Sequence, residues 1–89
     1  MNTLPIISEF LGAFLLLLSI LATGNAFVIG ATLAVIILLI GGVSGAHINP
    51  AVSVVMYVKG ALSLNELLAY SAAQVVGGIS ALYAYKSFA

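Results

Sequence analysis

The stretch that decides the fold lies in the middle of the chain and reads Ser44-Gly45-Ala46-His47-Ile48-Asn49-Pro50-Ala51-Val52-Ser53. Asn49 followed by Pro50 predicts the start of a helix, because asparagine is a favoured N-cap and proline fits the first helical position. The helix that follows is predicted to run from residue 50 to about residue 58, and the pair Lys59-Gly60 to end it. The residues before it, 44–48, are predicted to be irregular backbone.

Segment 44–58 is too apolar for an aqueous loop, yet a helix needs about 20 residues to cross a bilayer. We therefore expect a re-entrant segment whose short helix begins inside the membrane. Irregular backbone at that depth is tolerated only when it is buried in protein or lines a watery cavity. A half-helix with its positive end near the midplane is used to discriminate between solutes or ions. The segment is thus predicted to be a pore element, with the carbonyls of Gly45, Ala46 and His47 as acceptors.

Three long apolar segments surround this element. They cover about residues 5–23, 26–43 and 64–87. The first is expected to be capped by Thr3. It is expected to be a transmembrane span and not a cleaved signal peptide, because no basic residue precedes it and Glu9 lies near its start. The third begins at Ser63-Leu64-Asn65-Glu66, which has the spacing of a capping box. The pattern predicts an all-α membrane protein of one domain, residues 1–89, with three transmembrane helices and one re-entrant half-helix.

The composition supports a membrane protein and excludes several functions. Hydrophobic residues make up 64% of the chain and charged residues 4%, against about 25% charged in soluble domains. An integral, multi-pass protein is expected, most simply in the cell membrane. Because the net charge is zero, we expect no nucleic-acid partner. The absence of cysteine excludes disulfides and thiol chemistry. One histidine cannot make a metal site alone, and we expect no cofactor and no enzymatic activity, because carboxylate pairs, activated nucleophiles and phosphate-binding loops are missing from the sequence.

The quoted stretch resembles the first signature loop of the aquaporin and aquaglyceroporin channels, the major intrinsic protein family. Glu9-Phe10-Leu11-Gly12-Ala13-Phe14 is similar to the motif of that family's first helix, with Ala13 in place of the more usual threonine. Ala73-Gln74-Val75-Val76-Gly77-Gly78 resembles its third helix. Family members carry two inverted repeats, and the second usually adds an arginine to the filter. This chain resembles the first repeat only, half an aquaporin.

The resemblance implies roles for individual residues. Asn49 would donate its amide N–H to a passing solute, Pro50 would fix the first turn, and Ala51 would let two such helix starts meet at the midplane. Asn49 can also be read as a helix cap only. His47 is expected beside the pore in a structural role.

Two polar residues on the spans are expected to brace the loop. The resemblance implies that Glu9 is a buried carboxylate accepting from loop amides, with a position at the lipid headgroups as the alternative. An unsatisfied amide at the mid-span position of Gln74 would be costly, so it is expected to brace the loop or a neighbouring helix. The four tyrosines are expected to include interfacial anchors, with no chemistry assigned to them.

Transferring the family's filter positions by spacing from Asn49 points to four apolar candidates, Ile29, Ile37, Ala46 and Val52. In a two-fold pore, each end would take Ile29 from one chain and Ile37 from the other. Water-selective members present aromatic, histidine and arginine groups there. The resemblance therefore implies a hydrophobic constriction, for which small neutral solutes such as glycerol are as plausible as water.

Three helices are too few to enclose an aqueous path, so transport is expected to require more than one chain. Identical chains rebuild an inverted repeat only when they insert into the membrane in opposite orientations. The orientation of a chain is governed mainly by the Lys and Arg residues near the membrane ends of its helices. Lys59 and Lys86 are predicted to lie on opposite sides, which leaves little bias. An antiparallel homodimer is the expected minimal pore, and the family's tetrameric habit would imply four dimers, or eight chains.

Other functions remain open at this stage. The chain could pair with a different half that supplies the arginine. It could also be a non-transporting membrane subunit or a hole-forming protein, although neither needs the triplet Asn49-Pro50-Ala51. A proton-carrying proteolipid or a small drug exporter would need an acid deep in a span, whereas Glu9 and Glu66 lie near span ends. A gene fragment that never folds is the remaining alternative.

Overall fold

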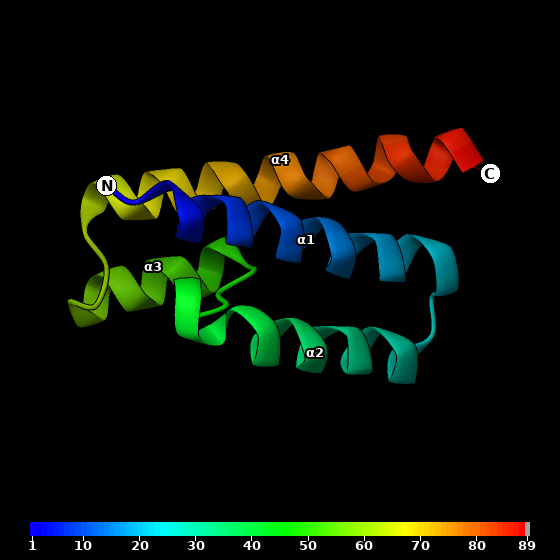
Figure 1. The fold of residues 1–89 in the computed structure, drawn as a ribbon, viewed down its shortest axis with the longest axis horizontal. Helices are drawn as coiled ribbons and strands as arrows, with labels where there is room; N and C mark the ends of the chain where they lie inside the picture. Colours follow the sequence, from blue (N-terminus) through cyan, green and yellow to red (C-terminus); the bar gives the residue numbers. More distant parts are fainter. Residues whose placement is uncertain (89) are drawn as a thin grey trace.

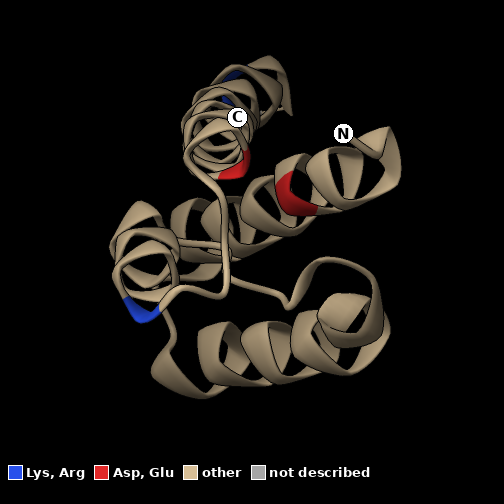
Figure 2. Ribbon diagram, turned by 90° about the vertical axis from the view of Figure 1, so that its left-hand side faces the viewer, with Lys and Arg blue, Asp and Glu red and all other residues tan. Residues whose placement is uncertain are grey.

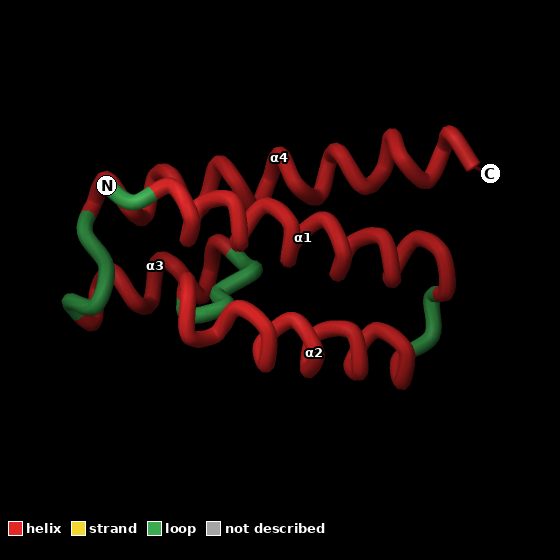
Figure 3. Tube along the Cα trace, viewed as in Figure 1, coloured by secondary structure: helices red, strands yellow, loops and turns green. Residues whose placement is uncertain are grey.

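The chain folds into four α-helices in the computed structural model, which describes residues 1–88 (Figure 1). The helices are α1 (Thr3–Thr23), α2 (Ala26–Ser44), α3 (Pro50–Lys59) and α4 (Leu64–Phe88). Among the described residues there is no strand, and the connections are short, as the tube view shows (Figure 3). Of the four, α1, α2 and α4 are long and apolar enough to span a membrane, and α3 is shorter. The predicted all-α class, with three spans and one short helix, is confirmed.

The helices form a bundle in which α1 and α4 run side by side in the same direction (Figure 1). The second helix, α2, turns back along α1, while α3 packs on α4 and occupies only one end of the bundle. The molecule measures 40 × 23 × 20 Å. Its long axis thus matches a bilayer, which is about 40–45 Å thick with its headgroups.

The helix ends follow from local side-chain chemistry. Asn2, and not Thr3 as expected, caps α1, because its Oδ1 accepts from the N–H of Leu4 at 3.0 Å. The capping box at the start of α4 is confirmed: Glu66 accepts from the N–H of Ser63 at 2.9 Å, and the Ser63 hydroxyl accepts from the N–H of Glu66 at 3.1 Å. Each of these ends depends on residues close in sequence.

Small residues bring α1 and α4 into close contact. Ala73, Gly77 and Ala81 are buried on one face of α4. A Cβ at Gly77 would lie 2.5 Å from the carbonyl oxygen of Phe10, so only glycine permits this approach of the two backbones. By contrast, Gly30 on α2 has open space where a Cβ would be. The small residues of α4 therefore form a packing surface for α1, while Gly30 of α2 is left uncovered within one chain.

Candidate functional site

The loop between α2 and α3 adopts a backbone that few sequences tolerate. Gly45 caps α2 with φ 86°, and its N–H donates to the carbonyl of Gly41. Two residues that are not glycine also have positive φ, Ala46 at 49° and Ile48 at 63°. Such left-handed conformations cost about 1–2 kcal/mol per residue, and more for a β-branched side chain. The loop keeps this shape only because its surroundings hold it.

Glu9 on α1 is the centre of those surroundings and is fully buried, with 0% exposure. Its Oε2 accepts from the hydroxyl of Ser44 at 2.6 Å and from the N–H of His47 at 3.0 Å. Its Oε1 accepts from the N–H of Ile48 at 2.7 Å and from Nε2 of Gln74 at 2.8 Å. Four donors from three separate segments thus meet the four acceptor positions of one carboxylate. The side chain of Glu9 thus lies inside the bundle, against the loop.

A second layer of hydrogen bonds joins the loop to α3 and α4. Nε2 of Gln74 also donates to the hydroxyl oxygen of Ser53, at 3.0 Å. The same hydroxyl lies 2.9 Å from Nδ1 of His47. Ser53 is fully buried in the first turns of α3. The half-helix is therefore tied to α4 and to its own preceding loop by one serine.

Tyr70 on α4 belongs to this cluster, so among the four tyrosines it is not one of those left free to act as interfacial anchors. Its side chain is 4% exposed, and its hydroxyl donates to the carbonyl of Ser44 at 2.8 Å. Its ring lies against that of His47, with the centroids 4.9 Å apart. Tyr70 and Gln74 are four residues apart and so share one face of α4. That spacing is a signal in the sequence by which Tyr70 could have been found.

The direction of the loop carbonyls follows from these contacts. The described chain contains no cis peptide bond, and in a trans peptide the C=O points opposite to the N–H of the next residue. Because the N–H groups of His47 and Ile48 point to Glu9, the carbonyls of Ala46 and His47 point away from it. The N–H of Ala46 points to the hydroxyl of Ser44, so the carbonyl of Gly45 points away from Ser44.

This leaves three successive carbonyl acceptors that point away from the hydrogen-bonded cluster around Glu9 and Ser44. Within residues 1–88, the carbonyls of Gly45, Ala46 and His47 accept no backbone hydrogen bond. In a membrane, backbone acceptors without a partner must face water or a polar ligand. The geometry therefore suits a row of carbonyls that offers hydrogen bonds to a mobile polar molecule.

The triplet that follows the row starts α3. Oδ1 of Asn49 accepts from the N–H of Ala51 at 2.8 Å, and Pro50 occupies the first turn. With Oδ1 engaged on the helix, the Nδ2 group of Asn49 is the donor that its exposed side chain offers outward. Asn49 is thus a cap, and its position beside the three carbonyls adds one donor to their acceptors.

A groove begins at this helix start and continues along α1 and α4. Its volume is about 470 Å³, and Ile48, Asn49 and Pro50 form its end wall. Its side walls are Leu16, Leu17 and Ile20 of α1 with Gln74, Val75, Gly78 and Ile79 of α4. The groove lies beyond the start of α3, in the part of the bundle where only α1, α2 and α4 continue (Figure 1).

The four filter candidates are not gathered into one ring. Ile29 and Ile37 are both on α2, eight residues and therefore about 12 Å apart along its axis. Ala46 lies in the loop and Val52 in the first turn of α3. One chain therefore places Ile29 and Ile37 at two different depths.

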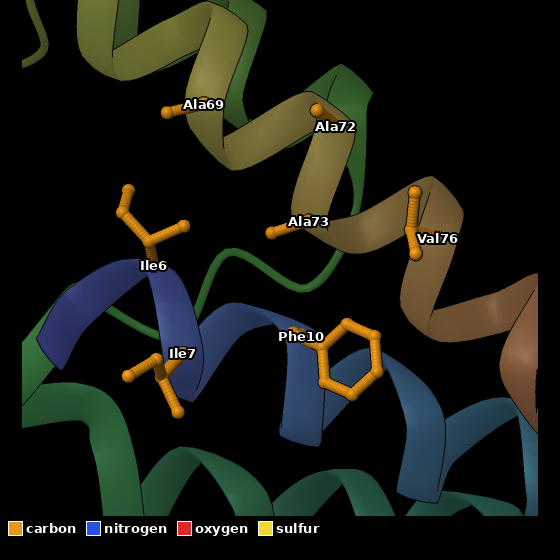
Figure 4. Close-up of a pocket in the computed structure, with 7 residues that line it drawn as sticks. All are labelled: Ile6, Ile7, Phe10, Ala69, Ala72, Ala73 and Val76. Atoms are coloured by element: carbon orange, nitrogen blue, oxygen red, sulfur yellow. The ribbon is translucent and has the colours of Figure 1, made fainter. Parts of the chain in front are cut away.

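A further apolar groove, of about 450 Å³, lies between α1 and α4 near their first turns (Figure 4). Its lining is Ile6, Ile7, Phe10, Ala69, Ala72, Ala73 and Val76. None of these side chains carries a hydrogen-bonding group, and none belongs to the cluster around Glu9. In the part of the chain that the structure describes, no three His, Cys, Asp or Glu residues gather into a metal site either.

Charged residues are few, and they lie apart from one another when the bundle is viewed from its end (Figure 2). Lys59 ends α3, and Lys86 lies in the last turn of α4. These two helix ends lie at opposite ends of the molecule (Figure 1). Each end of the bundle therefore carries one lysine.

Comparison with known proteins agrees with this geometry. A family model described as "Major intrinsic protein" matches residues 19–88. The chain belongs to the major intrinsic protein family. Glycerol uptake facilitator protein-like 6 of Lactiplantibacillus plantarum is 36% identical over 92% of the chain. Aquaglyceroporin AqpS of Rhizobium meliloti is 45% identical over 63% of the chain, and Aquaporin Z of Brucella melitensis is 43% identical over 65%.

The matched regions amount to 42%, 24% and 25% of these three relatives, so the chain spans less than half of each. No solved structure matches the chain significantly. Family membership, together with three helices long and apolar enough to cross a bilayer, makes the chain a multi-pass integral membrane protein. Membership also agrees with the expectation that the chain is not an enzyme.

Sequence reasoning missed Ser44, Ser53 and Tyr70, which complete the hydrogen bonds around Glu9 and Gln74. The two serines belong to the quoted stretch, where nothing distinguishes a buried hydroxyl from a solvated one. Their partners lie 35 residues away for Ser44 and 21 for Ser53. The packing of all four helices brings these groups together.

Proposed function

We propose that the chain forms a passive membrane channel for water or small neutral solutes such as glycerol. The observation that carries the proposal is the row of carbonyls from Gly45 to His47. These carbonyls are turned away from Glu9 or from the Ser44 hydroxyl that Glu9 binds, and the donor of Asn49 follows them. The hydroxyl group of a solute both donates and accepts hydrogen bonds. It can therefore donate to the three carbonyls in turn and then accept from Asn49, and these hydrogen bonds replace those that it made to water. Membership of the major intrinsic protein family supports the same function.

The start of α3 would discriminate against cations. The amide dipoles of a helix place about half a positive charge at its N-terminus. In α3 that end is at Asn49 and Pro50, beside the carbonyl row. A neutral hydroxyl pays no electrostatic cost there, whereas a cation is repelled. The filter candidates Ile29, Ile37, Ala46 and Val52 are all apolar, which favours uncharged solutes and leaves water and glycerol as the two solutes to compare.

The pore is proposed to need a second copy of the chain in the inverted orientation. The groove at the tip of α3 supports this, because it continues past Asn49 and Pro50 where one chain supplies no fourth helix. In the pair, two Asn49-Pro50-Ala51 starts meet at the midplane, and each pore end combines Ile29 of one copy with Ile37 of the other. Lys59 and Lys86 at opposite ends permit both orientations in the membrane. Four such pairs, eight chains, would correspond to the tetramers of the family.

The second candidate is a heteromeric channel, in which a different chain supplies the other half and its arginine. The short share of each relative that the chain matches favours it equally with the homodimer. A non-transporting subunit or a hole-forming protein explains neither the carbonyl row nor the buried carboxylate behind it.

Stopped-flow light scattering on proteoliposomes tests the channel directly, with water and glycerol gradients applied in turn. The purified protein is expected to raise at least one permeability above that of empty liposomes. Asn49→Asp keeps the helix cap but replaces the outward donor by an acceptor, so we expect permeability to fall with the fold retained. If folded wild-type protein leaves both permeabilities at the level of empty liposomes, the homomeric channel is excluded.

A further inference from the structure

Helix α1 contacts the loop at a second position, Gly12, one turn beyond Glu9. Gly12 is buried, and a Cβ built on it would overlap Cδ1 of Ile48. The same Cβ would lie 3.1 Å from Cγ2 of Ile36 and 3.1 Å from Cδ1 of Ile40. Because Gly12 has no side chain, it leaves a small space next to the α2 side chains of Ile36 and Ile40. The end of the Ile48 side chain fills this space, which is called the seat below.

Ile48 is the residue of the loop that most needs such a seat. Its φ of 63° is left-handed, a conformation that β-branched residues rarely adopt and that persists only when neighbours hold it. Its side chain is 4% exposed and packs with Ala13 and Ile36 in the apolar core. Helix α1 thus holds Ile48 twice: Glu9 binds its N–H at 2.7 Å, and Gly12 receives its side chain.

The position of Ile48 controls the two groups on either side of it. His47, just before it, contributes the last carbonyl of the acceptor row. Asn49, just after it, contributes the donor. The atom in the seat is the end of the Ile48 side chain, and Ile36 and Ile40 close the seat around it. Displacing that side chain removes one of the two contacts by which α1 holds the backbone between His47 and Asn49.

We propose that Gly12 is a positioning residue for permeation: its lack of a side chain sets the depth of Ile48, and thereby the spacing between the His47 carbonyl and the Asn49 donor. This inference rests on the proposed channel function. Glu9 fixes the polar side of the loop and Gly12 the apolar side, and both are needed for one geometry.

A compensating pair of substitutions tests the seat. Gly12→Ala fills the seat and is expected to reduce permeability in the stopped-flow assay by roughly tenfold. Ile48→Val removes Cδ1, the atom that the new methyl would overlap. Alone it leaves the seat partly empty, so it is expected to lower permeability by about twofold to threefold, less than Gly12→Ala does. In the double variant the two changes offset one another, and permeability is expected to return to within about threefold of wild type. Gly42→Ala on α2 is the matched control, because a Cβ there meets nothing within 4 Å.

The rescue distinguishes positioning from general damage, since two independent defects would add rather than cancel. Unchanged permeability in Gly12→Ala, or a double variant no better than Gly12→Ala alone, overturns the inference while wild-type permeation leaves the channel standing. Should Gly12→Ala fail to fold, the double variant decides by recovering, or not recovering, both helicity and permeation. A wild-type protein without permeability removes the channel and this inference together.

Discussion

The two halves of the bundle differ in how completely one chain fills them. In the near half, which contains α3, the loop is held by Glu9 and Ser53, both fully buried. In the far half, from the tip of α3 to the turn at Gly24 and Asn25, α1 and α4 continue beside a groove of about 470 Å³. Apolar side chains in that groove stay open, with Ile79 51% exposed.

One chain completes the polar cluster of the near half but leaves the apolar groove of the far half open. Among the described residues, the buried side-chain nitrogen and oxygen atoms all have hydrogen-bond partners inside the chain, with the single exception of the Oε1 atom of Gln74. The far-half surfaces are mostly apolar, and in a membrane such surfaces face lipid or pack against another chain. The hydrogen-bonded cluster around Glu9 is therefore complete within one chain, while the far half is where the proposed inverted copy would place its own α3.

The largest effect is expected from breaking the near half at its centre. Glu9→Gln replaces one acceptor oxygen by a donor, so two of the four bound donors face an NH₂ group. Unsatisfied buried donors cost about 1–3 kcal/mol each, and we expect about 3 kcal/mol of destabilisation, measured by thermal unfolding in detergent followed by circular dichroism. Glu66→Gln is the control, because a glutamine carbonyl still completes the capping box. Equal stability of the two variants would show that the buried carboxylate does not hold the near half together.

A smaller effect is expected at the edge of the same cluster. Tyr70→Phe removes the hydroxyl that donates to Ser44 at 2.8 Å but keeps the ring that lies on His47. The loss of one buried hydrogen bond predicts about 1 kcal/mol of destabilisation in the same unfolding measurement. Tyr83→Phe, on a side chain 65% exposed, should change nothing measurable. A Tyr70 variant as stable as the Tyr83 variant would remove Tyr70 from the cluster.

The smallest effect on stability is expected in the far half. Ile79→Ala trims a wall of the open groove and should cost less than about 0.5 kcal/mol, as for other substitutions away from packed sites. If a second copy fills this groove, the variant should nevertheless lower water or glycerol permeability. Val76→Ala, three residues away and on the groove of Figure 4, should alter neither quantity. A drop in stability at Ile79 comparable to that of Tyr70→Phe would contradict the contrast between the halves.

The parts of the fold that depend on neighbouring residues were predictable from the sequence. Asn49 before Pro50 marks the start of α3, and Ser63 with Glu66 marks that of α4, because caps act within three or four residues. The wrong cap at α1 has the same local origin: Asn2 and Thr3 are both favourable, and one residue of difference decides which side chain reaches the free N–H.

The contacts that shape the site lie far apart in sequence and were only partly predictable. The resemblance indicated Glu9 and Gln74, but it did not indicate that Tyr70 would bind the end of α2. Nor does any pattern reveal that Ile48 needs the empty space at Gly12, because that contact joins residues 36 positions apart through the packing of α1 on α2. Sequence periodicity gives the buried face of each helix, whereas the register between helices decides which side chains meet.

Cross-linking between copies tests most directly whether one chain supplies half of a pore. The chain contains no cysteine, so single cysteines report only the introduced position. Ala51→Cys lies at the start of α3, where two inverted copies would meet, and Val58→Cys lies near its far end, 78% exposed. In oxidised proteoliposomes the inverted pair predicts a disulfide-linked dimer for Ala51→Cys and little for Val58→Cys. A folded Ala51→Cys protein that stays monomeric, or that cross-links no more than Val58→Cys, would contradict the paired pore.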